Sequence, residues 1–426
     1  MAIGRTLSVG IDIGTSQVKV LVAEYPLQNN QGQNRSQTSA NEKDTPRPTT
    51  QNSKADSTTP RIVSTGISET KGMRHGYITN VSEVAKSIRT AVDQAQRGAG
   101  TTIKRAFVSI GGIGLGAIIS TSSVNTTKAD SEITDLDVKR AIDESEKELP
   151  HLYIQNRKII HTIPLEYRID GKRVLGKPQG LKGLRLEARV LYITCLSHHL
   201  SDILLALEEA DIEALDVIAS PMAGSAVTLQ KTQKIAGCLF ANIGSETTSI
   251  MVFENNIPIS MEVFPFGSND VTNDIALGLK VSLEDADEIK RGNDRGLIYS
   301  KKKLDEIVIA RLSDIFDLID DHLKRIDRSG LLPAGITMTG GGAGLQNIDE
   351  LAKIALHLPA KQAALAFQGN SKGIVHDNEW STAYGLAVLG LSNDDNSTVD
   401  LELLGVKRIF EKTGKSIWAW IKKFLP

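Results

Sequence analysis

Residues 9–20 of the chain are Val9-Gly10-Ile11-Asp12-Ile13-Gly14-Thr15-Ser16-Gln17-Val18-Lys19-Val20. This stretch predicts two apolar strands joined by a tight turn, which is a β-hairpin. Gly14 allows a ligand to approach the backbone closely, and Thr15 and Ser16 offer N–H and hydroxyl donors. Lys19 adds a positive charge, so the hairpin is suited to bind a polyphosphate.

Asp12 stands near the end of the first strand of this hairpin. A carboxylate repels a phosphate at short range, so we expect Asp12 to act through a divalent cation. Mg²⁺ usually keeps several of its water molecules in proteins. The sequence therefore predicts that Asp12 holds Mg²⁺ through water.

A second hairpin of the same kind is expected at residues 237–253, where an apolar strand again runs into Ile-Gly and a group of hydroxyl residues. A third element, at residues 335–343, is an apolar strand that ends in Gly340, Gly341 and Gly342 before a predicted helix. Two matching hairpins and a glycine turn resemble the actin-like ATPase fold. In this α/β fold two related RNase H-like domains clamp one nucleotide, and the glycine turn passes the adenosine.

The composition is that of an ordinary soluble globular protein, with 40% hydrophobic and 23% charged residues, and 426 residues suffice for two or more domains. The formal net charge of −2 argues against a general nucleic-acid binder. Cys195 and Cys238 stand in or beside apolar strands and are expected to be buried free thiols. No signal peptide or bilayer-length apolar run is evident, which predicts a cytoplasmic protein.

Two segments interrupt the two-domain pattern. Residues 26–60 are rich in Gln, Asn, Ser, Thr and Pro, and we expect a disordered insertion between two strands. Residues 111–194 have the pattern of an inserted α+β module, with strands near 116–123, 158–169 and 184–193 and a helix at 135–149.

The C-terminal residues 409–426 predict an amphipathic helix that follows a polar linker. From Gly405 onward the chain has six cations and one acid, which favours an interfacial helix on anionic lipid. The alternative is a terminal helix docked on its own domain. The residues assigned to the membrane are Ile417, Trp418, Trp420, Ile421, Lys422, Lys423, Phe424 and Leu425.

Taken together, the chain resembles the FtsA family of bacterial cell-division proteins, the actin homologues that tether FtsZ filaments to the membrane. The stretches that carry this resemblance are 12–19, 72–84, 159–167, 267–275, 286–290, 339–343, 381–385 and the amphipathic end. The resemblance implies a two-domain actin-like fold in which the inserted module is subdomain 1C, an SHS2-like domain that replaces the usual subdomain 1B. The implied divisions are 1A at 1–110 and 195–234, 1C at 111–194, 2A at 235–266 and 331–392, 2B at 267–330, a linker at 393–408 and the membrane helix at 409–426.

The resemblance implies ATP and Mg²⁺ as ligands. The positions that match the family's nucleotide site are Asp12, Gly14, Thr15, Ser16, Lys19, Asn242, Gly244, Ser245, Glu246, Thr247, Asp287, Lys290, Gly340, Gly341 and Gly342. Asn242 replaces a metal-facing Asp, and Ser220 stands before Pro221 where hydrolytic relatives carry Glu. Glu246 also puts a negative charge where phosphates should bind. No residue is assigned a catalytic role, and ATP hydrolysis is expected to be weak or absent.

The resemblance also implies partners. Arg311 is expected to pair with an acidic group of the FtsZ C-terminal peptide, although many relatives have Glu-Pro before this arginine and this chain has Ile309-Ala310. The alternative is that Arg311 is a solvated helix residue. Self-association into filaments, contacts with other divisome proteins, and a position on the cytoplasmic face of the membrane at the division site follow from the same resemblance. The alternatives are a pilus-assembly homologue of the PilM type and a sugar-kinase-like phosphotransferase.

Overall fold

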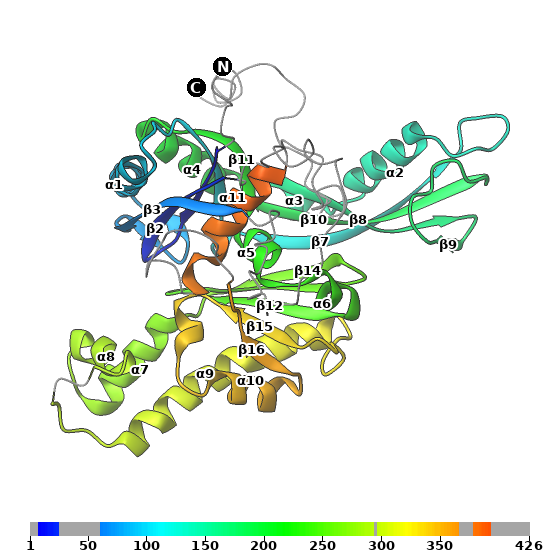
Figure 1. The fold of residues 1–426 in the computed structure, drawn as a ribbon. Coiled ribbons are helices and arrows are strands. Elements are labelled where there is room, and N and C mark those ends of the chain that lie inside the picture. The colour runs from blue at the N-terminus through cyan, green and yellow to red at the C-terminus, as the bar shows by residue number, and fades with distance from the viewer. Residues whose placement is uncertain (1–6, 25–59, 294–295, 366–377, 393–426) are drawn as a thin grey trace, which may run out of the picture.

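The computed structural model describes residues 7–24, 60–293, 296–365 and 378–392. The C-terminal linker and amphipathic helix, and the insertion up to residue 59, lie outside these ranges. Figure 1 shows the first domain at the upper left, the inserted module at the upper right and the second domain below.

The first domain is built on a five-stranded sheet in the order β11-β6-β1-β2-β3. Its strands are β1 (Leu7–Ile13), β2 (Gln17–Glu24), β3 (Arg61–Glu69), β6 (Arg105–Ile110) and β11 (Glu213–Ala219). The first three strands are antiparallel, whereas β6 and β11 run parallel to β1. Helices α1 (Val81–Ala99) and α4 (Ser197–Glu209) lie on this domain, and the Asn80 side chain caps α1 by accepting from the Glu83 N–H.

The second domain repeats this topology. Its sheet has the order β14-β13-β12-β15-β16, with three antiparallel strands followed by two parallel ones. The strands are β12 (Cys238–Ile243), β13 (Thr248–Glu254), β14 (Ile257–Phe264), β15 (Ile336–Thr339) and β16 (Ala360–Gln362). The duplication predicted from the two hairpins is therefore confirmed.

The inserted α+β module is also confirmed. Its sheet has the order β7-β10-β8-β9 and is covered by a helix whose first turn is closed by a Thr134–Asp137 capping box. The elements are β7 (Gly116–Asn125), α2 (Asp135–Lys147), α3 (His151–Ile154), β8 (Arg157–Ile169), β9 (Lys172–Val174) and β10 (Arg185–Leu196).

Further elements are a small hairpin of the first domain and the helices that surround the sheet of the second. They are β4 (Met73–Arg74), β5 (Tyr77–Ile78), α6 (Lys231–Ala236), α7 (Ser268–Leu279), α8 (Leu283–Lys290), α9 (Lys301–Arg325) and α10 (Ile348–Leu356). After β15 the glycine turn forms a short 3₁₀ helix, η1 (Gly341–Gly344), so the helix expected directly after the glycines begins only at Ile348.

Two small-residue helices join the domains. Helix α5 (Ser220–Thr228) connects β11 to the second domain, and α11 (Ser381–Ser392) follows a 3₁₀ turn, η2 (Asn378–Trp380), and returns to the first. A Cβ on Gly385 would lie 1.9 Å from the Ala223 carbonyl oxygen, so only glycine permits this close helix crossing. Figure 1 shows α11 beside α5 at the centre of the molecule.

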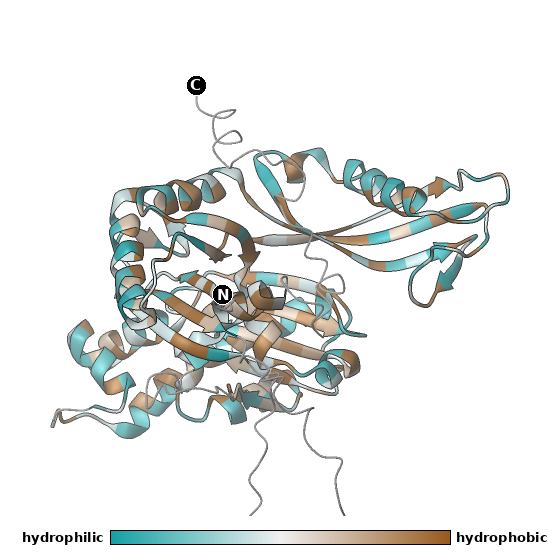
Figure 2. Ribbon diagram, turned by 45° about the horizontal axis from the view of Figure 1, so that its top comes forward, coloured by the Kyte–Doolittle hydropathy of each residue, from teal (hydrophilic) through white to brown (hydrophobic). Residues whose placement is uncertain are grey.

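The hydrophobic core lies on the strands and on the faces of the helices that cover them. In Figure 2 brown residues are frequent along the strands, while the helices carry both brown and teal residues. Phe240, Phe253 and Phe316 are fully buried. Cys195 and Cys238 are buried free thiols, as predicted.

Candidate functional site

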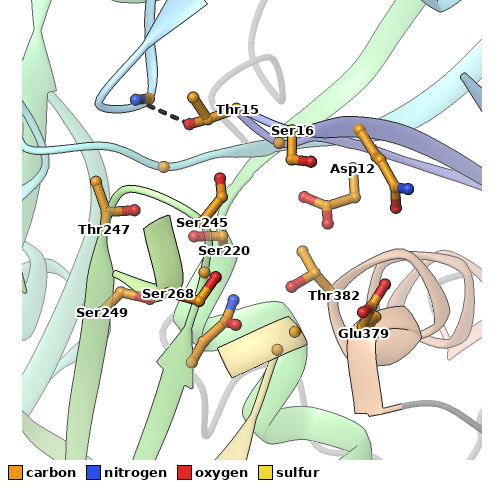
Figure 3. A pocket seen from close by; sticks show the side chains of 18 of the residues that line it. Asp12, Thr15, Ser16, Ser220, Ser245, Thr247, Ser249, Ser268, Glu379 and Thr382 are labelled. Carbon is orange, nitrogen blue, oxygen red and sulfur yellow. Dashed lines mark hydrogen bonds between the residues drawn. The ribbon is translucent and has the colours of Figure 1, made fainter. Parts of the chain in front are cut away.

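A cavity of about 320 Å³ lies between the two domains, and both predicted hairpins line it. In Figure 3, Thr15 and Ser16 face Ser245 and Thr247 across the cavity, and Thr382 and Glu379 close another side. The lining is rich in glycine and hydroxyl residues, which suits an anionic ligand with many oxygen acceptors.

The two hairpin turns have the same internal geometry. The Gly14 N–H donates to the Gln17 carbonyl at 3.1 Å, and the Gly244 N–H donates to the Thr247 carbonyl at 2.8 Å. A segment later in the chain holds each turn in place. The Thr70 backbone N–H donates to the Ser16 carbonyl, and the Asn269 backbone N–H donates to the Ser245 carbonyl. Both turns therefore present a preformed backbone to the cavity.

Asp12 lies beneath the first turn, at the end of β1. The Ser109 hydroxyl donates to Asp12 Oδ1 at 2.8 Å, and the Ile13 N–H donates to Ser109 Oγ at 3.1 Å. Burial raises the pKa of the Asp12 carboxyl above its ordinary value, and the positive charge of Lys19 and the Ser109 hydrogen bond partly oppose this effect.

The predicted cations of the cleft are paired with carboxylates. Lys19 Nζ lies 3.3 Å from Glu379 Oε2. Lys290 Nζ lies 2.9 Å from Asp287 Oδ1 and donates to the Thr272 hydroxyl at 2.7 Å. Burial alone would raise the pKa of the Asp287 carboxyl, but Lys290 and Arg291 outweigh this effect and lower it.

The N-terminus of α5 also faces the cavity. Its first residue, Ser220, lines the cavity, and no side chain caps the helix. The first N–H groups of a helix have no partner within the helix and carry partial positive charge, so this end favours an anion.

Most of the residues predicted to bind nucleotide line this cavity. It brings together both hairpins, the Asp287–Lys290 pair of α8 and the glycine turn. The predicted residues that line it are Asp12, Gly14, Thr15, Ser16, Lys19, Asn242, Gly244, Ser245, Thr247, Asp287, Lys290, Gly340 and Gly341.

Two predicted residues do not line the cavity. Gly342 is buried, because η1 turns it toward Ile243, where an added Cβ would lie 2.4 Å from Ile243 Cγ2. Glu246 bonds to the turn at His75 instead, where its Oε2 accepts a hydrogen bond from the His75 N–H at 2.5 Å. The expectation that Glu246 places its charge among the phosphates is therefore corrected.

Several lining residues were not predicted from the sequence. They include Gly76, Ser109, Gly111, Gly112, Ser249, Ser268, Asn269, Arg291, Glu379 and Thr382, whereas Ser220, which also lines the cavity, was singled out in the sequence as the residue at the position of a hydrolytic Glu. Gly111 and Gly112 directly follow an apolar strand and Ser268 opens a helix, and both features are sequence signals for a ligand-facing turn. Glu379 carried no comparable signal.

Arg311 lies outside the cleft, on α9. Its guanidinium is bidentate to Asp274 of α7, with distances of 2.6 and 3.1 Å, and it also lies 3.5 Å from Asp314. About a quarter of the Arg311 side chain is exposed, so it is not the free solvated residue that the alternative described. A peptide carboxylate would have to share or replace Asp274.

Among the described residues, no helix combines the length and apolarity needed to cross a bilayer. The same residues contain no cluster of three or more His, Cys, Asp or Glu side chains suited to hold a metal ion.

Two family models match the chain. The model for the cell division protein FtsA matches residues 239–385, and that for the SHS2 domain inserted in FtsA matches residues 116–194. Cell division protein FtsA of Pseudomonas aeruginosa is 27% identical over 410 residues, covering 91% of this chain and 90% of the relative. FtsA of Bacillus subtilis is 26% identical, covering 91% and 84%, and that of Escherichia coli K12 is 24% identical, covering 99% of each.

Solved structures share the fold at lower identity. The PilM–PilN type IV pilus biogenesis complex contains a chain with a TM-score of 0.63 and 16% identity, covering 91% of this chain and 99% of that one. The ethanolamine utilization protein EutJ from Carboxydothermus hydrogenoformans gives a TM-score of 0.51 at 13% identity, with 92% of each chain covered. With the duplicated sheets, the inserted module and the matched family models, the chain belongs to the FtsA family of cell-division proteins, which has an actin-like fold.

Proposed function

We propose that the chain binds ATP in the cleft between its two domains and, in this form, tethers FtsZ filaments to the membrane. The observation that carries the nucleotide part is the cavity lined by both hairpins, with thirteen predicted positions around it. The tether follows from family membership and from the basic, amphipathic sequence of the tail.

The cleft supports a polyphosphate in three ways. Gly14, Thr15, Gly244 and Ser245 offer backbone and hydroxyl donors from opposite sides. The N-terminus of α5 adds partial positive charge. Lys19 supplies a full charge, and phosphate oxygens would replace Glu379 as its partner.

The residues of the cleft fit Mg²⁺ bound through water. Asp12 and Asn242 offer hard oxygen atoms, and a cation would offset the cost of the buried Asp12 charge. Bound there, Mg²⁺ would neutralise phosphate charge. Asp12 would orient its water shell, and Ser109 holds the carboxylate in place.

Slow turnover is the expected behaviour of this cleft. Ser220 has no carboxylate to take a proton from an attacking water, and Asn242 has no charge to attract the cation as an aspartate would. The chain thus acts as a nucleotide-dependent scaffold that assembles into filaments.

Vesicle flotation tests the tether. Purified chain, FtsZ, ATP, Mg²⁺ and vesicles containing anionic lipid are centrifuged through a density gradient. FtsZ is expected to float only when the chain is present, and to stay at the bottom when the chain carries Trp420→Glu. FtsZ that stays at the bottom with the unmodified chain would refute the tether.

A further inference from the structure

The turn between β4 and β5 bonds to both phosphate hairpins. The Gly76 N–H donates to Thr15 Oγ1 of the first hairpin at 3.1 Å, which is the dashed line in Figure 3. The His75 N–H donates to Glu246 Oε2 of the second hairpin at 2.5 Å, and His75 Nδ1 lies 3.3 Å from the Glu246 carbonyl oxygen. Two adjacent residues of one domain therefore contact the hairpins of both.

This turn is anchored to the first domain. The Ile113 N–H donates to the His75 carbonyl oxygen at 3.3 Å. Gly76 has a φ of 80°, and a Cβ there would lie 2.2 Å from Gly112 Cα, so a larger residue would break the contact. The ring of Tyr77 meets the ring of His199 edge-on, with centroids 5.1 Å apart. If the domains separate, the turn moves with the first domain and Glu246 with the second.

We propose that Glu246 and the turn at His75–Gly76 form a clasp that holds the cleft closed around the polyphosphate. This inference rests on the proposed nucleotide binding, because it assigns a regulatory contact to the same cleft. It also explains why a carboxylate is tolerated in a phosphate hairpin. Glu246 does not line the first cavity and instead lines a second, neighbouring one with Arg74 and Asn269.

Thr15 couples the clasp to the nucleotide. Its Oγ1 accepts from Gly76, so its own O–H remains available to donate to a phosphate oxygen. A hydroxyl that donates becomes a better acceptor, because linked hydrogen bonds polarise one another. Nucleotide binding and closure of the turn therefore stabilise each other.

The clasp is expected to act mainly on release. A contact made only in the closed state shifts the open–closed equilibrium by its own free energy. The bond from the His75 N–H ends on a carboxylate oxygen, and hydrogen bonds to carboxylates are stronger than those between neutral groups. Its removal should speed nucleotide dissociation about tenfold or more.

Stopped-flow measurements with a fluorescent ATP analogue test this. The analogue is loaded with Mg²⁺ and chased with excess ATP, using unmodified chain, Glu246→Ala and Glu246→Gln. Glu284→Ala, an exposed glutamate outside the cavity lining, is the matched control. Thermal melts check folding, and hydrogen exchange over residues 73–78 reports the turn directly.

The analogue should dissociate from Glu246→Ala about tenfold faster or more than from the unmodified chain, and from Glu246→Gln with a smaller increase. Its dissociation from Glu284→Ala should equal that from the unmodified chain. Exchange at the turn should rise in Glu246→Ala even without nucleotide. Unchanged dissociation and exchange in a folded Glu246→Ala would overturn the clasp. If the unmodified chain binds no analogue, the proposed nucleotide site is wrong, and the exchange at the turn still decides whether Glu246 holds it.

Discussion

Two side chains of the cleft, Asn242 and Ser220, set the expected rate of ATP hydrolysis. Both line the cavity, and the family resemblance places Asp and Glu at these positions in hydrolytic relatives. A positioned general base contributes about 10²–10⁴-fold. The double variant Asn242→Asp with Ser220→Glu should therefore release phosphate well above the unmodified chain, and each single variant should release less than the double one. Steady-state phosphate release measures this, and fast turnover by the unmodified chain would contradict it.

Arg311 gives a second test at the residue scale. If it binds an acidic group of the FtsZ peptide, it must first give up part of its pairing with Asp274. Arg311→Ala should weaken peptide binding five- to thirtyfold, about 1–2 kcal/mol, because the pair is neither fully exposed nor fully buried. Asp274→Asn should strengthen binding, because it frees the guanidinium. Fluorescence polarisation with labelled peptide measures both, and equal affinity in all three chains would remove Arg311 from the interface.

The sequence predicted those site residues whose neighbours in the chain form a recognisable pattern. Gly14, Thr15 and Gly244 stand between two apolar strands, and this pattern predicts a hairpin. Ser109 and Glu379 entered the site only through tertiary contacts with Asp12 and Lys19, which no local pattern encodes. Glu246 was assigned correctly to a hairpin but to the wrong side of it, because its partner His75 is 171 residues away.

At the scale of elements, β8 of the inserted module supports the wall of the cleft through His161. The buried His161 accepts at Nε2 from the Ala219 N–H, at 3.1 Å, directly before Ser220. Burial lowers the pKa of His161 to about 4, so the ring is neutral near pH 7. Its folded-state pKa lies below the unfolded value of about 6.5, so the unfolded chain binds more protons between these two values.

Stability should therefore fall as the pH falls from about 6.5 toward 4, by up to roughly 1.4 kcal/mol per pH unit for this group. Urea unfolding of the unmodified chain and of His161→Gln at pH 7, 6 and 5 measures the effect. The variant should lose less stability on acidification. Burial also lowers the pKa of His199 to about 4, so His161→Gln will still lose some stability as the pH falls. Parallel pH profiles for the two chains would show that His161 does not titrate as described.

Most strands could be predicted from the sequence because the paired strands are neighbours in the chain, as in the β1–β2 and β12–β13 hairpins. The predicted continuity across residues 26–60 is confirmed at its ends, since Glu24 pairs with Arg61 in adjacent strands. The interval between the glycine turn and α10 was less readable. A run of glycines does not determine whether an α-helix or a 3₁₀ helix forms, and the 3₁₀ turn there depends on packing against Ile243.

At the scale of the whole molecule, the fold is shared with PilM, whereas the two family models match FtsA and its inserted SHS2 domain. The fold alone does not separate these functions. The subdomain boundaries remain proposals from the resemblance, and α11, which falls within the proposed range of 2A, packs against β1 and β2 of the first domain. The membrane tail rests on its sequence alone.

That tail should bind anionic membranes weakly as a single copy and firmly along a filament. The apolar stripe of the predicted helix consists of five side chains: Ile417, Trp420, Ile421, Phe424 and Leu425. Burying them at about 1.5–3 kcal/mol each is offset largely by ordering the segment, at about 1 kcal/mol per residue. Cations add about 1 kcal/mol each near an anionic surface, and salt screens them. Trp420→Glu should abolish vesicle co-sedimentation, whereas Lys423→Glu should weaken it only at low salt. Persistent binding by Trp420→Glu would favour a helix docked on its own domain.

The most direct test of the account is a calorimetric titration of the purified chain with ATP and Mg²⁺. By this account, the hairpins of both domains bind one polyphosphate. One hairpin residue is therefore changed in each domain, Lys19→Ala in the first and Ser245→Asp in the second, and Glu284→Ala is the control. We expect one site per chain, affinity at least about tenfold weaker in both hairpin variants, and no change in the control. An unmodified chain that binds no ATP, or hairpin variants that bind it as tightly as the unmodified chain, would contradict the account.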